Sequence, residues 1–271
     1  MPRVAVLQMT SGVDPHANAQ AMVSAVGAAE MGGATMLFTP EMSGLLDRDR
    51  KRASGRIVAE SEDPVLAAMR EAAAGAGIWV AIGSLAVARE DGRWVNRAFV
   101  IDSSGEVVAR YDKIHMFDVD LDTGESWRES NAYAAGGSVV SVDTPAGRLG
   151  LTVCYDIRFP ALFDALGKAG CDLIAIPAAF TVPTGKAHWH VLQRARAIEA
   201  SAYVVSAAQV GKHEDGRSTY GHSLVVDPWG EVLLDLGGEQ AGIGFAEIDP
   251  ARIAEVRAQL PSLANRKTLP T

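Results

Sequence analysis

The most informative stretch of the chain spans residues 149–160 and reads Leu149-Gly-Leu-Thr-Val-Cys154-Tyr-Asp-Ile-Arg-Phe-Pro160. Its first half is apolar, which is typical of a buried strand, and the strand ends at a cysteine. Polar residues then lead into a helix expected over Ala161 to Lys168. Such a strand-to-helix turn exposes the Cys154 side chain, leaves the following backbone N–H groups free, and favours a thiolate near the helix N-terminus. The stretch therefore indicates a nucleophile, with an inert, buried cysteine as the open alternative.

Strand-like and helix-like segments alternate before this stretch. We expect strands at Val4 to Gln8, Met36 to Phe38 and Trp79 to Leu85, and helices at Asn18 to Glu30 and Pro64 to Ala74. Two hairpins should follow, around the turns Asp102-Ser-Ser-Gly105 and Thr144-Pro-Ala-Gly147. The alternation indicates strands that are covered by helices.

The alternation resumes after Cys154. We expect strands at Leu173 to Ile176, Tyr203 to Ala208 and Phe245 to Ile248, a helix at Lys186 to Ala200, and a hairpin around Asp227-Pro-Trp-Gly230. Asp249-Pro250 then opens a helix, with the aspartate as its N-cap. No low-complexity linker or repeat divides the chain. The pattern predicts one mixed α/β domain over residues 1–271, with two sheets flanked by helices and with residues 249–271 as a candidate oligomerisation segment.

Composition argues against several classes of function. The 271 residues carry a formal net charge of -8, so a basic surface for nucleic acid is not expected. The longest apolar stretches, such as Leu173 to Pro183, are shorter than the roughly 20 residues that span a bilayer. The first residues resemble a strand rather than a secretory signal, so we expect a cytoplasmic protein that binds neither membrane nor nucleic acid. In that compartment Cys154 and Cys171 should stay unpaired, and Cys171 should be structural.

Two further residues are candidates for acid–base chemistry. A thiol nucleophile needs a base, and none of the six histidines occupies an obvious position for that role. Glu41, in Leu37-Phe-Thr-Pro-Glu41-Met, and Lys113, in Arg110-Tyr-Asp-Lys113-Ile-His, both follow expected strands. Taken singly, Glu41 is more typical of a solvated loop residue or a helix cap, and Lys113 of a surface charge.

Several segments together resemble the nitrilase superfamily of carbon–nitrogen hydrolases. The similarity covers nearly the whole chain and rests on Pro40-Glu41, Lys113-Ile-His-Met-Phe-Asp-Val-Asp, Trp127-Arg-Glu129-Ser, Val153-Cys-Tyr-Asp-Ile-Arg-Phe-Pro160, Ala187-His-Trp-His-Val-Leu-Gln-Arg-Ala-Arg-Ala-Ile-Glu199 and Tyr220-Gly-His-Ser-Leu-Val-Val-Asp-Pro-Trp-Gly230. The resemblance implies that Glu41 is the base, Lys113 the catalytic lysine and Cys154 the nucleophile. It also implies a further catalytic glutamate, Glu129, a four-layer α-β-β-α sandwich, and a homodimer or higher homo-oligomer.

The expected reaction is hydrolysis of a carboxamide. Cys154 would attack the carbonyl carbon while Lys113 and the backbone N–H of Tyr155 bind the oxyanion. Glu41 would protonate the departing ammonia or amine and then activate the water that cleaves the thioester. No metal ion or other cofactor is required by this scheme. Arg158 is a candidate ligand for a substrate carboxylate or, alternatively, a structural ion-pair partner.

Within the superfamily, the segments are most similar to the branch that contains ω-amidase and deaminated glutathione amidase, and Ala207 to His222 resembles the latter type. We therefore expect a small-molecule amide, with deaminated glutathione first and α-ketoglutaramate second. Alternatives are an N-carbamoyl amino acid amidohydrolase and a nitrilase. Lys212, His213 and Arg217 would meet the anionic substrate at the mouth of the pocket, or else belong to a solvated loop.

Two segments of the chain resemble metal sites. Asp118-Val-Asp120-Leu-Asp122-Thr-Gly124, followed by Glu129, resembles a calcium-binding EF-hand loop, but its glycine is one position late and no amphipathic helix precedes it. A calcium-binding, non-enzymatic protein is thus the alternative from a different functional class. His188 and His190 are two positions apart on an expected helix and should point to different faces, so we expect no metal site there.

Overall fold

The strands of this chain form two six-stranded sheets in a computed structural model that describes residues 1–120, 124 and 126–267. The first sheet contains, in spatial order, β16 (Gly242–Glu247), β1 (Arg3–Gln8), β2 (Met36–Phe38), β3 (Trp79–Ala88), β4 (Trp94–Ile101) and β5 (Val107–Asp112). The second contains β15 (Val232–Asp235), β14 (Leu224–Val226), β11 (Tyr203–Ser206), β10 (Leu173–Ala175), β9 (Gly147–Leu151) and β8 (Ser141–Thr144). In each sheet three parallel strands are flanked by antiparallel ones, so both sheets follow one plan.

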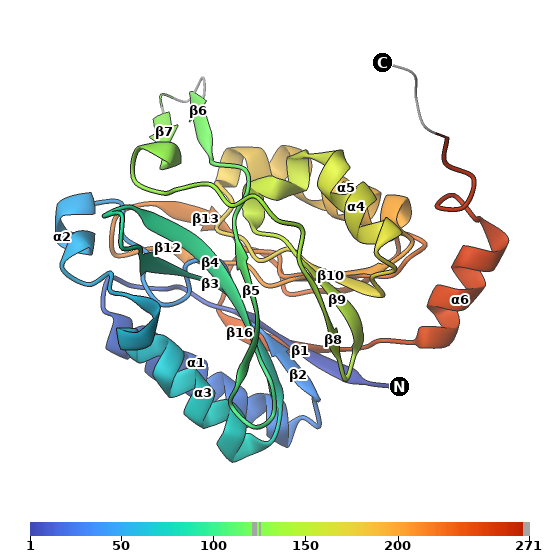
Figure 1. The fold of residues 1–271 in the computed structure, drawn as a ribbon, viewed down its shortest axis with the longest axis horizontal. Helices are drawn as coiled ribbons and strands as arrows, with labels where there is room; N and C mark the ends of the chain where they lie inside the picture. The colour runs from blue at the N-terminus through green and yellow to red at the C-terminus, as the bar shows by residue number, and fades with distance from the viewer. Residues whose placement is uncertain (121–123, 125, 268–271) are drawn as a thin grey trace.

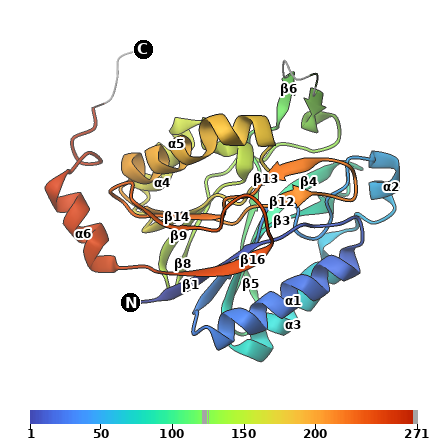
Figure 2. The same ribbon diagram turned by 180° about the vertical axis from the view of Figure 1, so that it is seen from behind.

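Helices cover the outer face of each sheet (Figure 1). The helices α1 (Pro15–Met31) and α3 (Pro64–Ala76) lie on the first sheet, and α4 (Pro160–Lys168) and α5 (Val182–Ala200) lie on the second, as Figure 2 shows from behind. Side chains alternate along β1, since Val6 belongs to the core between the sheets and Leu7 to the core under α1 and α3. The expected four-layer α-β-β-α sandwich is confirmed.

Aspartate-proline pairs begin three of the helices. The side chains of Asp14, Asp63 and Asp249 accept backbone N–H groups in the first turns of α1, α3 and α6 (Pro250–Gln259) at 3.0, 2.8 and 2.9 Å. These contacts satisfy donors that have no partner within the helix. In Figure 1, α6 lies at the edge of the sandwich. None of the described helices combines the length and the apolar character needed to cross a membrane.

The structure differs from the sequence-based expectation at short elements and at element ends. The helix α5 begins at Val182 rather than Lys186, because Pro183 fits a first helical turn. β9 ends at Leu151, so the residues after it are free to form the 3₁₀ turn η3 (Cys154–Arg158). The elements that were not predicted are α2 (Arg50–Ser54), the turns η1 (Glu60–Glu62) and η2 (Glu129–Asn131), and the hairpins of β6 (Asp118–Asp120) with β7 (Ser126–Arg128) and of β12 (Val210–Lys212) with β13 (Ser218–Tyr220). Segments this short carry no readable periodicity.

Candidate active site

The predicted base, lysine and nucleophile lie together at one end of the sandwich. Glu41 and Lys113 follow β2 and β5, which end at the same edge of the first sheet, and Cys154 follows β9 of the second sheet, which packs against the first. These three residues, with Glu129 and Tyr155, line a cavity of about 180 Å³. The structure thus brings together the residues that the sequence placed after separate strands.

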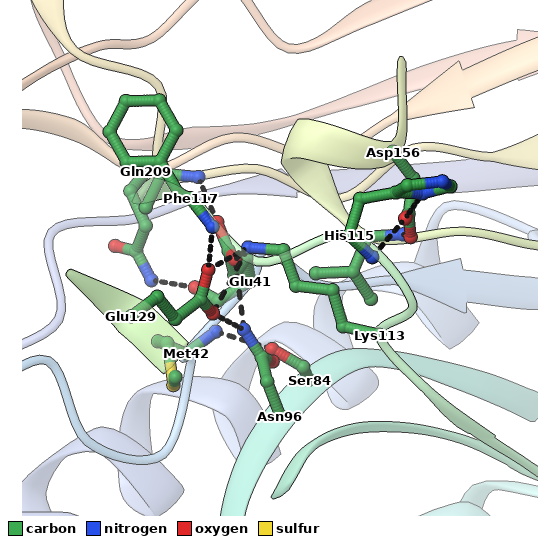
Figure 3. A network of polar contacts seen from close by, with 12 residues as sticks. Glu41, Met42, Ser84, Asn96, Lys113, His115, Phe117, Glu129, Asp156 and Gln209 are labelled. Atoms are coloured by element: carbon green, nitrogen blue, oxygen red, sulfur yellow. Dashed lines mark hydrogen bonds and ion pairs between the residues drawn. The ribbon is translucent and has the colours of Figure 1, made fainter. Parts of the chain in front are cut away.

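Lys113 is enclosed by two glutamates, as Figure 3 shows. Its Nζ lies 3.0 Å from Oε1 of Glu41, and 3.1 and 2.9 Å from Oε1 and Oε2 of Glu129. The lysine is 1% exposed. Burial lowers the pKa of Lys113, but the negative charges of Glu129 and Glu41 outweigh burial and hold that pKa well above its usual value. Lys113 is therefore a fixed positive charge in the wall of the cavity.

Cys154 begins the 3₁₀ turn in a strained conformation. Its φ of +49° lies in the left-handed region that residues other than glycine seldom adopt. The residue is only 8% exposed, so the expectation of an exposed side chain is wrong. Burial first, and then the negative charge of Glu41, raise the pKa of the thiol well above its usual value in spite of Lys113. The expected resting thiolate is therefore corrected to a neutral thiol.

Glu41 is the ionised neighbour of that thiol. Burial raises the pKa of Glu41, but the charge of Lys113 and hydrogen bonds from Cys154, Lys113 and the Ala179 N–H together leave it lowered. Oε1 of Glu41 accepts from Lys113, whereas Oε2 accepts from the Ala179 N–H at 2.8 Å. In the resting site the proton is on sulfur and the negative charge is on the carboxylate.

The turn that carries Glu41 is held from two sides (Figure 3). On one side, the Met42 N–H donates to Oγ of Ser84 at 2.9 Å. On the other, Nε2 of Gln209 donates to the backbone carbonyl of Glu41 at 3.0 Å. Gln209 is fully buried and comes after β11 of the second sheet, whereas Ser84 lies on β3 of the first. Residues from both sheets therefore hold Glu41 in position.

Asn96, on β4, completes the cluster and was missed by the sequence analysis. Its Nδ2 donates to Oε1 of Glu41 at 3.0 Å and to Oε1 of Glu129 at 3.1 Å, and the residue is fully buried. Together, Asn96 and Lys113 occupy both acceptor positions of Oε1 of Glu41. Only Oε2 is left to receive a proton. A single asparagine in a strand gives no sequence signal for such a contact.

A second buried carboxylate, Asp156, joins the cysteine turn to the segment after Lys113. Its Oδ2 accepts from the Tyr111 hydroxyl at 2.7 Å and from the Val153 N–H at 2.8 Å, and its Oδ1 lies 2.6 Å from Nδ1 of His115. These contacts fix the distance between the nucleophile and the lysine. The local sequence around Asp156 predicts no such role for it.

Of the two predicted substrate contacts, one lines the cavity and the other does not. Tyr155 lines the cavity, and none of the described residues accepts a hydrogen bond from its N–H, whereas the Cys154 N–H donates to Pro177 at 2.8 Å. Arg158 does not line the cavity, and its guanidinium instead lies 5.4 Å from the centre of the Phe180 ring. The expectation that Arg158 meets the substrate is therefore corrected, because its guanidinium packs against the rings of Phe180 and Tyr155 and contacts His188 instead.

The three residues expected at the mouth of the pocket also differ from one another. His213 is 3% exposed and contacts the Ser11 carbonyl and the Thr219 hydroxyl at 2.9 and 2.7 Å, so its role is structural. Lys212 is exposed and does not line the cavity. Arg217 does line it, with its guanidinium 5.0 Å from the centre of the Trp127 ring.

Further arginines line the mouth of the cavity and were not predicted. The lining includes Arg48, Arg50 and Arg128. The lining carboxylate Asp47 is already paired with Arg52 at 2.6 Å. Arg128 and Arg217 are paired with Asp120 and Asp215, so the positive charge that remains at the mouth comes from Arg48 and Arg50, although the chain as a whole is acidic.

The residues of the calcium alternative have other partners. Asp118 accepts the backbone N–H of Ser130, in the turn η2, at 3.1 Å, and Asp120 is paired with Arg128 across the β6–β7 hairpin. Glu129 is directed at Lys113. Asp122 lies outside the described residues. The described part of this segment is a hairpin and not the helix–loop–helix of an EF-hand.

Comparisons with known proteins agree with this geometry. The family described as Carbon-nitrogen hydrolase matches residues 3–258. Deaminated glutathione amidase of Yersinia enterocolitica is 39% identical over 269 residues, which cover 97% of this chain and 92% of that protein. The structure of the NitFhit protein of Caenorhabditis elegans superimposes with a TM-score of 0.91 at 37% identity, where the match covers 98% of this chain and 65% of that one. An amidase variant from Nesterenkonia sp. AN1, with acrylamide added to its active-site cysteine, has a TM-score of 0.81 at 27% identity and covers 96% of this chain and 98% of that one.

Proposed function

The chain belongs to the carbon–nitrogen hydrolase family, and we propose that it is a cysteine-dependent amidase that hydrolyses the carboxamide C–N bond of a small acid. The observation that carries this proposal is the buried cluster in which Glu41 contacts both Cys154 and Lys113. A thiol, a carboxylate that can accept its proton and a fixed positive charge are the groups that amide hydrolysis requires.

In the first half of the reaction, Cys154 transfers its proton to Oε2 of Glu41 as its sulfur attacks the carbonyl carbon. The resulting oxyanion is stabilised by Nζ of Lys113 and by the unengaged N–H of Tyr155. When the C–N bond breaks, Glu41 returns the proton to the departing nitrogen. Ammonia, or an amine, leaves and a thioester remains on the sulfur.

In the second half, water replaces ammonia. Glu41 takes a proton from the water molecule as its oxygen attacks the thioester carbonyl, and the same two donors bind the second oxyanion. The C–S bond then breaks, the sulfur recovers the proton from Glu41, and the acid is released. One carboxylate serves both halves because its Oε2 alternates between accepting and donating one proton.

Glu129 and Asn96 act through their neighbours in this scheme. Glu129 holds Nζ of Lys113 with both carboxylate oxygens, which orients the lysine charge toward the cavity. Asn96 bridges the two glutamates and keeps Glu41 ionised at Oε1. Both are positioning residues, and Glu129 also borders the cavity where a substrate amide nitrogen would lie.

For the substrate we propose an α-keto acid with a terminal carboxamide, deaminated glutathione first and α-ketoglutaramate second. The positive mouth supports an anionic substrate, and Arg217 is the predicted contact that lies there. The similarity to deaminated glutathione amidase supports the longer substrate.

We propose that the enzyme is a cytoplasmic homodimer or higher homo-oligomer, that residues 1–271 are one hydrolase domain, and that catalysis uses no metal ion or cofactor. The position of α6 at the edge of the sandwich supports a role for residues 249–267 in assembly. Light scattering at micromolar concentration should give at least twice the mass of one chain, and a monomer would contradict the proposal.

The test of function is ammonia release from a panel of amides by the purified chain. Deaminated glutathione and α-ketoglutaramate should be hydrolysed in preference to simple aliphatic amides. Hydrolysis of aliphatic nitriles or N-carbamoyl amino acids, with both keto-acid amides untouched, would place the chain elsewhere in the family.

A further inference from the structure

Two imidazoles and one carboxylate meet on the outer side of the second sheet, away from the cluster of Glu41 and Cys154. They are His190 on α5, His222 in the turn before β14, and Asp235 at the end of β15. Nε2 of His190 and Nδ1 of His222 each lie 3.1 Å from Oδ2 of Asp235. One ligand atom from each residue lies within 4.8 Å of the others.

Hydrogen bonds with backbone groups and with Trp189 hold His222 and Asp235 in place without a metal ion. His222 adopts φ +55°, its N–H donates to the Gly237 carbonyl at 2.8 Å, and its own carbonyl accepts from Nε1 of Trp189 at 2.8 Å. Asp235 accepts the Gly237 N–H at Oδ1, which also lies 3.0 Å from Nδ1 of His222, so Oδ2 is the oxygen that both imidazoles share. Metal ligands are commonly oriented in this way by hydrogen bonds to their remaining atoms.

The distances between the ligand atoms suit an ion with tetrahedral coordination. Around a zinc ion with nitrogen and oxygen ligands at about 2.0–2.2 Å, neighbouring ligand atoms are about 3.3 Å apart. The two measured edges of 3.1 Å are close to this value. The three residues are partly exposed, so water can supply a fourth ligand. His222 also lines a surface groove, through which an ion can enter.

We propose that His190, His222 and Asp235 form a surface site for a zinc-class transition-metal ion, separate from the amide-hydrolysing cluster. The competing explanation is a purely hydrogen-bonded pair of histidines on one carboxylate. His188 lies on the same helix as His190 but has different surroundings, since its Nδ1 is 3.3 Å from the guanidinium of Arg158. His188 has no carboxylate beside it among the described residues.

Such an ion would join α5 to the β14–β15 hairpin. α5 contributes Thr184 to the wall of the active cavity, and β13 contributes Thr219. A ligand that binds the folded chain and not the unfolded chain raises its stability with concentration. We therefore expect zinc bound at this site to raise the melting temperature and to leave the chemical step unchanged, because none of the three ligands of the site takes part in the reaction.

The experiment is a zinc titration of the full-length chain by isothermal calorimetry. Cys154→Ala serves as the parent, because the active-site thiol is itself a zinc ligand and would otherwise compete. We expect one zinc ion per chain and an increase in melting temperature with zinc but not with magnesium. In the Cys154→Ala background, Asp235→Asn and His190→Gln should each weaken binding at least tenfold and remove the thermal shift.

His188→Gln is the matched control, since it removes an exposed histidine two positions away on the same helix. It should bind zinc like the parent. His222→Asn adds a further variant, because asparagine tolerates the left-handed backbone better than most residues. The proposal fails if the parent binds no zinc, or if the folded Asp235→Asn and His190→Gln variants bind it as tightly as the parent.

Discussion

Cys154 and Cys171 are both buried, at 8% and 0% exposure, and the pKa of each thiol is raised mainly by burial. For Cys171 that pKa is about 11. Their surroundings differ. Cys154 lies in a left-handed turn beside Glu41 and Lys113, whereas Cys171 precedes β10 in the apolar core.

The comparison shows that neither burial nor a depressed pKa identifies the nucleophile here. A low thiol pKa would indicate a thiolate that is ready at rest. Cys154 instead has a carboxylate that can take its proton during the attack, and that carboxylate is kept ionised by Lys113. Cys171 has no hydrogen bond to a carboxylate among the described residues, since Asp172 acts on it only through its charge and its side-chain hydrogen bond is with Ser141, so it remains a small, largely apolar residue.

The largest expected effect is the loss of Cys154. Cys154→Ala should reduce amide turnover by roughly 10⁴-fold or more while the circular dichroism spectrum stays unchanged, because a nucleophile removed from a cooperating set removes nearly all of its rate. Cys171→Ala should keep most activity and lose about 1 kcal/mol of stability. Iodoacetamide should label Cys154 first, as mass spectrometry of digested protein would show. Full turnover by a folded Cys154→Ala variant would end the mechanism.

The second expected effect concerns the proton acceptor. Glu41→Gln keeps the shape of the side chain but cannot accept a proton, so turnover should fall by about 10²–10⁴-fold. Glu60→Gln is a matched control on the surface, where Glu60 only pairs with Arg97 and Arg110. Equal activity in the two variants would remove Glu41 from the reaction.

The third prediction concerns Asn96. Its hydrogen bond to Glu41 favours the ionised carboxylate, so Asn96→Leu should raise the pKa of Glu41 and cost roughly tenfold in kcat, the effect of about 1.4 kcal/mol. Activity requires the ionised carboxylate, so it is present above the pKa of Glu41 and is lost as the pH falls through that pKa. The acidic limb of the kcat/KM profile should therefore move to higher pH.

Asn96→Asp separates this positioning role from simple packing. Aspartate has the same shape but, when ionised, donates no hydrogen bond and adds negative charge between Glu41 and Glu129. A packing role predicts nearly normal activity and an unmoved pH profile in Asn96→Asp. The positioning role predicts a loss at least as large as in Asn96→Leu.

Local patterns made much of this site predictable, because Glu41, Lys113 and Cys154 each follow a strand within a distinctive segment. The family resemblance then supplied the layer order and Glu129. Asn96 was not predictable in this way, since its contact with Glu41 joins residues 55 positions apart. The neutral Cys154 thiol was also missed, because burial by two sheets outweighs the helix terminus that the local sequence suggested.

Contacts made by the folded chain, which local sequence does not show, also explain why only one of the three residues predicted at the mouth of the cavity lies there. Lys212, His213 and Arg217 are neighbours in sequence, but the β12–β13 hairpin sends them in different directions. The hairpin exposes Lys212, buries His213 and brings Arg217 to the cavity. Arg48 and Arg50 reach the same mouth from a distant segment.

The smallest expected effect separates Arg217 from Lys212. Arg217→Gln should raise KM for deaminated glutathione about fivefold to tenfold with kcat within twofold, because a remote contact made equally in ground and transition states changes mainly binding. Lys212→Gln should change neither constant, since Lys212 does not line the cavity.

Arg217 also pairs with the buried carboxylate of Asp215 at 2.7 Å. The variant Arg217→Lys is therefore needed beside Arg217→Gln, because lysine keeps a positive charge next to Asp215. If Arg217 binds substrate, the increase in KM should be larger for deaminated glutathione than for α-ketoglutaramate, whose shorter chain reaches less far toward the mouth. An equal loss of kcat on both substrates would show instead that Arg217 only supports the wall of the cavity.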